Sequence, residues 1–218
     1  MKKIGAITIG QAPRNDVMGD IAEILRGDIE LLQAGALDGL MLEDVEKLRP
    51  DGTGNTLVSR MRDGTAVTLQ EQKILPLMQR RIDALQAQGV SAILIMCTGE
   101  FPEVFTSKVP LIYPSKVICN IVASLNNVSR IGIITPEAAQ MEDIRKKWSR
   151  IVETVVPVQW NPYLEKRSET AVAQLREDLA VMDCFGYSRE MRDFASEAIS
   201  RPVILSRTMA ARVLLEIV

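Results

Sequence analysis

The residues best suited to chemistry are two cysteines, each of which follows a short apolar run. Cys97 comes directly after residues 92–96, and Cys184 follows residues 179–182 with Asp183 between. Such runs predict strands buried on both faces of a parallel sheet. Open α/β sheets bind ligands at the carboxyl ends of these strands. The sequence therefore predicts that both thiols lie at a ligand site.

Two thiols that flank a ligand can move a proton without a cofactor. One thiolate removes a proton from the carbon beside a carboxylate, and a thiol on the opposite face returns one. The ordinary cysteine pKa, about 8.5, falls when a helix amino terminus or a cation lies nearby. We therefore expect Cys97 and Cys184 to be the catalytic pair, with pKa values lowered toward neutrality.

Histidine is absent from the chain. Its absence excludes Ser-His and Cys-His catalysis and imidazole-ligated metal sites. No Walker or dinucleotide-binding fingerprint is present either. We expect no cofactor and no metal.

A small carboxylate or an amino-acid-like ligand needs hydrogen-bond donors beside the thiols. The turns that follow the two cysteines offer backbone N–H groups, and an arginine after the first predicted strand can bind a carboxylate with two nitrogens. Two further residues each begin a helix after a strand, and one acidic residue follows Cys97. The predicted ligand-binding residues are Arg14, Thr98, Gly99, Glu100, Thr135, Gly186 and Ser206.

Each of these residues also has a structural interpretation. A cysteine after a buried strand can be an inert core residue, and Cys119, within an apolar helix, is predicted to be one. Arg14 can be a solvated side chain of a first helical turn, and Glu100 a surface turn residue. Asp183 alternates with Cys184 along its strand, so we expect it to point away from the site and serve a structural role.

The remaining polar and glycine positions are expected to be structural. Arg60 and Arg62 lie on a predicted hairpin and are expected to be solvated, unless the hairpin covers the cleft and brings one of them to the ligand. Gly5 and Gly132 are predicted to allow close packing of helices on strands.

Strands alternate with helices along the chain, which predicts a parallel α/β architecture. Asp63-Gly64 between residues 56–61 and 65–69 is a strong hairpin signal, and residues 168–178 are predicted to be helical. Residues 3–8 resemble residues 130–135, and each copy precedes a cysteine-ended strand. We predict two pseudo-symmetric α/β halves, 1–115 with 206–218 and 116–205, a hairpin inserted near 55–70, and a ligand cleft between the halves.

Composition excludes several classes of protein. Apolar residues make up 47% of the 218 residues, charged residues 25%, and the net charge is −2, so nothing indicates nucleic-acid binding. No apolar stretch approaches the ~20 residues of a membrane span, and no signal-peptide pattern opens the sequence. Three cysteines without framework spacing favour reduced thiols and a cytoplasmic location. A homo-oligomer is compatible with the sequence.

Four motifs in order along the chain resemble the AroM family, whose biochemical activity is not established. They are Thr8-Ile-Gly-Gln-Ala-Pro-Arg-Asn-Asp-Val17, the arginine-rich hairpin around Asp63-Gly64, Cys97-Thr-Gly-Glu-Phe-Pro102 and Met182-Asp-Cys-Phe-Gly-Tyr187. The resemblance implies a fold similar to the aspartate/glutamate/hydantoin racemase superfamily. That superfamily has two pseudo-symmetric α/β halves and paired cysteines, which implies catalytic positions for Cys97 and Cys184.

The chain departs from amino-acid racemases beside both cysteines. Those enzymes follow the first cysteine with Asn-Thr and the second with Thr-His, whereas this chain has Thr98-Gly99 and Phe185-Gly186. The superfamily also contains decarboxylases, maleate-type isomerases and hydantoin racemases, so the substrate stays open. The leading hypothesis is a cofactor-independent isomerase or racemase-like enzyme that acts on a small carboxylate. The alternatives are a non-catalytic binding or regulatory protein with the same cleft, and a structural pair of core cysteines.

Overall fold

The computed structural model describes residues 2–25, 27, 29–53 and 55–218, and its described strands form two four-stranded parallel sheets and one antiparallel hairpin. The first sheet has the order β2-β1-β5-β6 and the second β10-β9-β7-β8. The strands of the first sheet are β1 (Lys2–Thr8), β2 (Ile29–Gly35), β5 (Ile93–Ile95) and β6 (Leu111–Ile112). Those of the second are β7 (Arg130–Thr135), β8 (Thr154–Gln159), β9 (Leu179–Met182) and β10 (Val203–Leu205).

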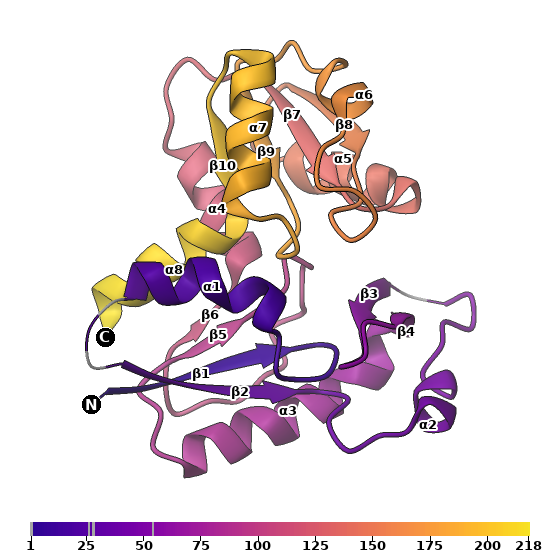
Figure 1. Cartoon of the computed structure of the whole chain (residues 1–218), viewed down its shortest axis with the longest axis vertical. Coiled ribbons are helices and arrows are strands. Elements are labelled where there is room, and N and C mark those ends of the chain that lie inside the picture. The colour runs from indigo at the N-terminus through magenta and orange to yellow at the C-terminus, as the bar shows by residue number, and fades with distance from the viewer. Residues whose placement is uncertain (1, 26, 28, 54) are drawn as a thin grey trace.

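Helices cover both sheets and fill the region between them (Figure 1). The last helix, α8, lies against α1 and α4, and its apolar residues join the core of the first sheet. The helices are α1 (Asn15–Leu25), α2 (Leu42–Glu46), α3 (Glu71–Ala87), α4 (Pro114–Ala123), α5 (Met141–Trp148), α6 (Glu169–Val172), α7 (Arg189–Ile199) and α8 (Ser206–Ile217), with a 3₁₀ turn, η1 (Ala138–Gln140), before α5.

The two sheets repeat one arrangement. In the first, β1 lies between β2 and β5, with Ile7 opposite Ile95; in the second, β7 lies between β8 and β9, with Ile134 opposite Met182. The similar segments of the sequence are therefore the equivalent strands β1 and β7. The strands that pair with them, β5 and β9, are the ones that lead to the two cysteines. The predicted pseudo-symmetric α/β fold is confirmed.

The predicted hairpin is also confirmed. Strands β3 (Thr56–Arg60) and β4 (Ala66–Gln70) pair antiparallel on either side of the Asp63-Gly64 turn, and Gly64 has a φ of +89°. This is the left-handed conformation that glycine adopts without steric cost. Figure 1 shows the hairpin beside the lower sheet, below the second half of the chain.

Two glycines allow close packing on the central strands: at Gly5 a helix packs on the strand, as predicted, whereas at Gly132 the covering residue, Leu175, lies outside a helix. A Cβ atom at Gly5 of β1 would lie 3.0 Å from Leu85 of α3, and one at Gly132 of β7 would lie 2.5 Å from Leu175. Because real Cβ atoms essentially never approach other heavy atoms below 3.0 Å, a side chain at Gly132 would displace Leu175.

The prediction of a helix over residues 168–178 is wrong beyond its first turn. Helix α6 ends at Val172, and the next amides, of Gln174 and Leu175, donate to carbonyls three residues back. The chain leaves the helix because Leu175 must fill the space over Gly132, and the amide of Arg176 then donates to the side chain of Glu177. Tertiary packing overrides a helical sequence here.

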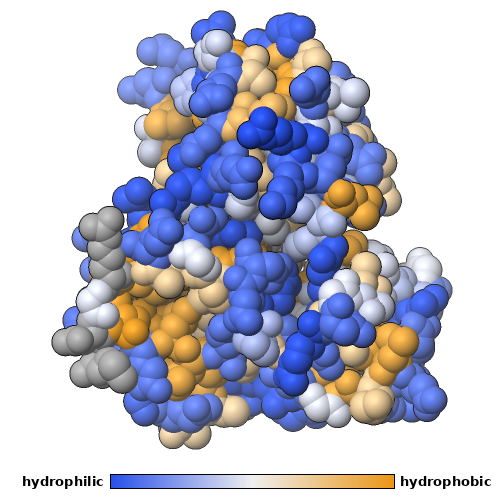
Figure 2. Space-filling view, in the orientation of Figure 1, coloured by the Kyte–Doolittle hydropathy of each residue, from blue (hydrophilic) through white to orange (hydrophobic). Residues whose placement is uncertain are grey.

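The surface is mixed in character. Figure 2 shows that apolar residues gather over the region of β1 and β2, whereas the face of the second half is mostly hydrophilic. Among the residues that the structure describes, no helix has the length and apolar character needed to cross a bilayer.

Candidate functional site

Both cysteines line one cavity of about 350 Å³. Its walls come from the carboxyl ends of β5, β7 and β9, from the hairpin strand β3 and from α5. Residues from both sheets therefore face a shared space, and Cys97 and Cys184 contribute to it from equivalent strand ends. This is the arrangement that the matched apolar runs of the sequence predict.

Each thiol lies in a turn of the same construction. The amide of Gly99 donates a hydrogen bond to Sγ of Cys97 at 3.3 Å, and the amide of Gly186 donates to Sγ of Cys184 at 3.3 Å. In both turns the donor is the glycine two residues after the cysteine. These two N–H groups, which the sequence offers to a carboxylate, are engaged with sulfur in this structure.

Burial dominates the protonation of both thiols. Desolvation raises the pKa of Cys97 to about 12, against the smaller lowering effect of the Gly99 amide. Desolvation also raises the pKa of Cys184, although the Gly186 amide and the cations Arg14 and Arg207 act in the opposite direction. The expectation that the pKa values are lowered toward neutrality is wrong, because removal from water outweighs the nearby donors.

Cys119 behaves as the sequence predicts for a core residue. It lies on α4, is partly buried against the apolar cluster beneath the second sheet, and does not line the cavity. Burial raises the pKa of its thiol to about 11.

Arg14 is buried, so the interpretation of a solvated side chain is wrong. It precedes α1 and lines the cavity, with a side chain that is 9% exposed. Its Nε and Nη2 atoms donate to the carboxylate of Asp16 at 2.8 and 2.7 Å, and Nη2 also donates to the Tyr163 hydroxyl at 3.3 Å. None of the described residues accepts a hydrogen bond from Nη1.

Tyr163 is a site residue that the sequence reasoning missed. It lies after β8, lines the cavity, and fits against the backbone of Gly186, where an added Cβ would be 2.6 Å from its ring and hydroxyl. Burial raises the pKa of its phenol. No local sequence pattern marks it, because the groups that hold it come from distant parts of the chain.

The hairpin reaches Tyr163 through Arg60. The guanidinium of Arg60 lies 4.0 Å from the centre of the tyrosine ring, and Nη2 donates to the tyrosine carbonyl at 3.4 Å. Arg60 is therefore half-buried rather than solvated, and the expectation of a solvated side chain is wrong. Arg62 is exposed over 64% of its side chain, as expected.

A buried ion pair lies beside the two cysteine turns. Nζ of Lys147 is 3.1 and 2.8 Å from the carboxylate oxygens of Asp183, whose Oδ2 also accepts from Nε1 of Trp148 at 2.8 Å. The same Nζ donates to the carbonyl of Thr98 at 3.2 Å. These bonds agree with the structural role expected for Asp183, although the residue also belongs to the cavity lining.

The other predicted ligand residues divide into two groups. Thr98, Gly99, Glu100 and Thr135 line the cavity, whereas Gly186 and Ser206 do not. Glu100 is exposed and pairs with Arg150 at 3.1 Å. Thr135 is fully buried and its hydroxyl donates to Oε1 of Gln140 at 3.1 Å.

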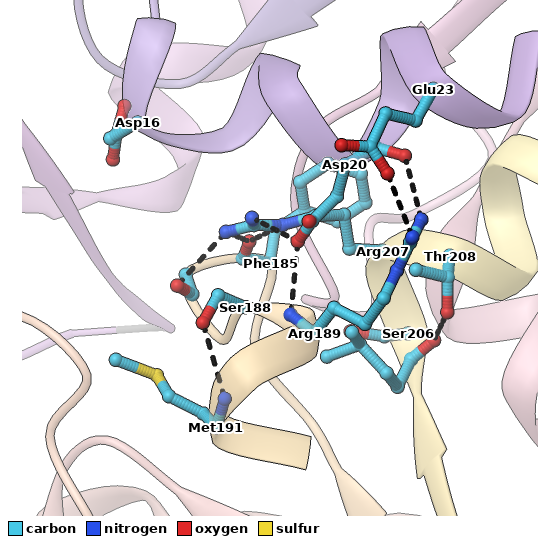
Figure 3. Close-up of polar contacts among 12 residues, drawn as sticks. Asp16, Asp20, Glu23, Phe185, Ser188, Arg189, Met191, Ser206, Arg207 and Thr208 are labelled. Atoms are coloured by element: carbon cyan, nitrogen blue, oxygen red, sulfur yellow. Dashed lines mark hydrogen bonds and ion pairs between the residues drawn. The ribbon is translucent and has the colours of Figure 1, made fainter. Parts of the chain in front are cut away.

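The start of α8 holds the turn after Cys184 (Figure 3). The buried hydroxyl of Ser206 donates to the Cys184 carbonyl at 3.1 Å. Arg207, which is 1% exposed, donates from Nε and Nη2 to the Phe185 carbonyl at 3.0 and 2.9 Å and from Nη1 to Asp20 of α1 at 2.9 Å. The sequence reasoning missed Arg207, since a single arginine in a helix carries no signal of burial.

The described part of the chain contains no evident metal site. No group of three or more cysteine, aspartate and glutamate side chains there is arranged to hold a metal ion.

Solved structures share this fold. The Picrophilus torridus aspartate racemase is 11% identical and has a TM-score of 0.62, with 99% of this chain and 94% of that chain covered. The Nocardia farcinica maleate cis-trans isomerase is 11% identical with a TM-score of 0.65 over 100% and 92% of the two chains. Glutamate racemase from Francisella tularensis, in complex with D-glutamate, is 15% identical with a TM-score of 0.55 over 99% and 80%.

These similarities establish an Asp/Glu racemase-like fold and nothing finer, because the identities are low. Among curated proteins, none matches this chain in sequence. The family model described as AroM protein matches residues 4–218, which is nearly the whole chain and includes both cysteine turns. The chain belongs to the AroM family.

Proposed function

We propose that this protein is a cofactor-independent isomerase or racemase-like enzyme that acts on a small carboxylate through Cys97 and Cys184. The observation that carries the proposal is that both thiols line one cavity from equivalent strand ends, each with a glycine amide on its sulfur. Two thiols beside one ligand supply the base and the acid that proton transfer at carbon requires.

Cys184 is the better candidate for the base. Two cations, Arg14 and Arg207, act to lower its pKa against burial and the charge of Asp183, whereas Lys147 is the cation that acts in this way on Cys97. In the proposed step the Cys184 thiolate takes a proton from the carbon next to the carboxylate. The electron pair of the broken C–H bond is held as an enolate, and the Cys97 thiol then gives its proton to the opposite face of that carbon.

The carboxylate of the ligand has a donor in Arg14. Its Nη1 atom has no acceptor among the described residues, and the arginine is fixed by Asp16 and Tyr163. A pre-positioned guanidinium binds an anion with little loss of conformational freedom. The structural neighbours named for aspartate, maleate and D-glutamate support small carboxylates as the first compounds to test.

Proton exchange in D₂O tests the proposal directly. The protein is incubated with each enantiomer of aspartate and glutamate, and deuterium at the α-carbon is followed by NMR. We expect exchange with at least one compound, and a fall of 10²-fold or more in the Cys97→Ser and Cys184→Ser variants. Cys119→Ser is the matched control, because Cys119 lies outside the cavity. Undiminished exchange in both cavity variants would contradict the roles of the thiols.

A non-catalytic binding protein is the second candidate. The observation that favours it is the raised pKa of both cavity thiols, which keeps them protonated at neutral pH. This candidate predicts that a small carboxylate raises the melting temperature of the wild-type protein and of both serine variants equally, without deuterium exchange.

A further inference from the structure

Each cysteine turn contains one peptide unit that is held at both ends. In the first turn this is the unit between Thr98 and Gly99: its carbonyl accepts from Nζ of Lys147 at 3.2 Å, and its N–H donates to Sγ of Cys97. In the second it is the unit between Phe185 and Gly186: its carbonyl accepts from Arg207, and its N–H donates to Sγ of Cys184.

The planarity of the peptide bond connects the two contacts. In a trans peptide the C=O and N–H groups point in opposite directions. A cation that fixes the carbonyl oxygen on one side of the turn therefore directs the N–H to the other side, where the sulfur lies. A positive charge at the oxygen also strengthens the N–H as a donor, because hydrogen bonds in series polarise one another.

The two cations are alike in their surroundings. Lys147 and Arg207 are 5% and 1% exposed, and each is paired with a carboxylate, Asp183 and Asp20. Figure 3 shows Arg207 between α1 and the turn after Cys184, with its guanidinium directed to Asp20 on one side and to the Phe185 carbonyl on the other. Burying a cation costs free energy unless it is paired and hydrogen-bonded, and here the bonds of both cations go to cysteine turns.

We propose that Lys147 and Arg207 are a matched pair of positioning residues, each of which aims one peptide N–H at one thiol so that the developing thiolate has a fixed donor. Lys147 serves Cys97 and Arg207 serves Cys184. This inference rests on the proposed function, because that function is the reason for stabilising a thiolate. The same arrangement of cation, peptide and sulfur would serve any reaction in which the sulfurs become negative.

Other charged groups near the thiols also influence the pKa values that the test measures. Cys97 is influenced by Cys184, Lys147 and Asp183. Cys184 is influenced by Asp183, Arg14 and Arg207, and it interacts in turn with the phenol of Tyr163. Among these, the only cation that bonds the turn of Cys97 is Lys147, and the only one that bonds the turn of Cys184 is Arg207.

Site-resolved alkylation tests the assignment. The rate of labelling of each cysteine is measured against pH by mass spectrometry in two charge-balanced variants, Lys147→Gln with Asp183→Asn and Arg207→Gln with Asp20→Asn. We expect the first to raise the apparent pKa of Cys97 by about one unit, and so slow its labelling about tenfold at a given pH. The pKa of Cys184 should not rise in this variant, because the Asp183 charge that raises it is removed. The second variant should raise the apparent pKa of Cys184 and leave that of Cys97 unchanged. The matched controls are Arg145→Gln on α5 and Arg212→Gln on α8, both exposed, which should change neither cysteine.

A pattern in which each variant raises the pKa of a different cysteine distinguishes the positioning role from a general loosening of the fold. Equal changes at both cysteines in either variant, or no change at either, would overturn the proposal. The single variants Lys147→Arg and Arg207→Lys keep the charge and serve if the double variants do not fold. They should shift the same cysteine in the same direction by a smaller factor, and a shift of the other cysteine would overturn the proposal equally. Because labelling needs no substrate, a cysteine-specific shift in a protein without deuterium exchange would contradict only the proposed function.

Discussion

The hydroxyl of Thr98 donates a hydrogen bond to the backbone carbonyl of Asp183 at 3.0 Å. Thr98 follows the first cavity cysteine and Asp183 precedes the second, so this bond joins the two cysteine turns directly. Lys147 makes a second link, since its Nζ binds the carbonyl of Thr98 and the carboxylate of Asp183. The two strand ends are therefore one connected unit.

Removal of the Thr98 hydroxyl should weaken this connection. Thr98→Val keeps the shape of the side chain but leaves the Asp183 carbonyl without that donor, so we expect the free energy of unfolding to fall by about 1 kcal/mol. Urea unfolding followed by circular dichroism measures the change. Thr98→Ser, which retains the hydroxyl, is the control and should lose less stability. An unchanged free energy of unfolding in Thr98→Val would mean that the hydrogen bond does not stabilise the protein.

The two glycines of the cysteine turns should respond differently to alanine. At Gly186 a Cβ would lie 2.6 Å from Tyr163 and 2.9 Å from Pro162, whereas at Gly99 its nearest neighbours are at 3.5 Å, an ordinary contact. Gly186→Ala must displace the tyrosine, and we expect it to cost about 1–3 kcal/mol, as overpacking does. Gly99→Ala should stay within about 0.5 kcal/mol of the wild type. Thermal unfolding of both variants distinguishes them, and equal losses would show that Tyr163 moves without cost.

The buried Cys97 thiol should make stability depend on alkaline pH. Burial raises its pKa to about 12 in the folded protein, while the unfolded chain keeps the ordinary value of about 8.5 to 9. The folded state therefore holds the proton more tightly. Its contribution to stability is complete below pH 9 and is lost as pH rises toward 12, at about 1.4 kcal/mol per unit.

The comparison of wild type with Cys97→Ser isolates this effect. The free energy of unfolding is measured in urea at pH 7, 8, 9 and 10. Between pH 9 and 10 the wild type should lose about 1 kcal/mol more than the variant, and between pH 7 and 8 the two should change in parallel. Parallel change over the whole range would show that the thiol titrates normally.

The hairpin and Tyr163 should be energetically coupled. The guanidinium of Arg60 lies 4.0 Å from the ring centre, and a cation over an aromatic face at a partly exposed site contributes about 0.5–1 kcal/mol. A double-mutant cycle with Arg60→Ala and Tyr163→Leu should give a coupling free energy of that size. The same cycle with exposed Arg62 in place of Arg60 should give no coupling. A coupling free energy of zero for Arg60 would show that its contact with the tyrosine ring does not stabilise the protein.

Local patterns predicted the parts of the site that lie at strand ends. Cys97 and Cys184 were found because buried strands and their ends have a sequence signature, and the Asp63-Gly64 hairpin because a tight turn requires a particular residue. Each of these features depends on residues that are close together in the sequence.

Lys147, Tyr163 and Arg207 could not be predicted in this way. Arg207 and its partner Asp20 are 187 positions apart, and Arg14 and Tyr163 are 149 apart. Their roles arise from tertiary contacts, and a lysine or arginine in a helix usually faces solvent. The direction of the thiol pKa shifts was mispredicted for a similar reason, because the extent of burial follows from the packing of the whole cavity and not from the turn itself.

The position of Arg207 on the last helix has a consequence for the order in which the molecule folds. The bonds from Arg207 to the Phe185 carbonyl span 22 positions and can form together with the second sheet, whereas its pairing with Asp20, 187 positions away, forms only when α8 docks on α1. Contacts of such long sequence separation are made late, because the chain must first lose the entropy of a large loop. The cation that holds the Cys184 turn therefore gains its carboxylate partner only after α1 and α8, near the two ends of the chain, have met.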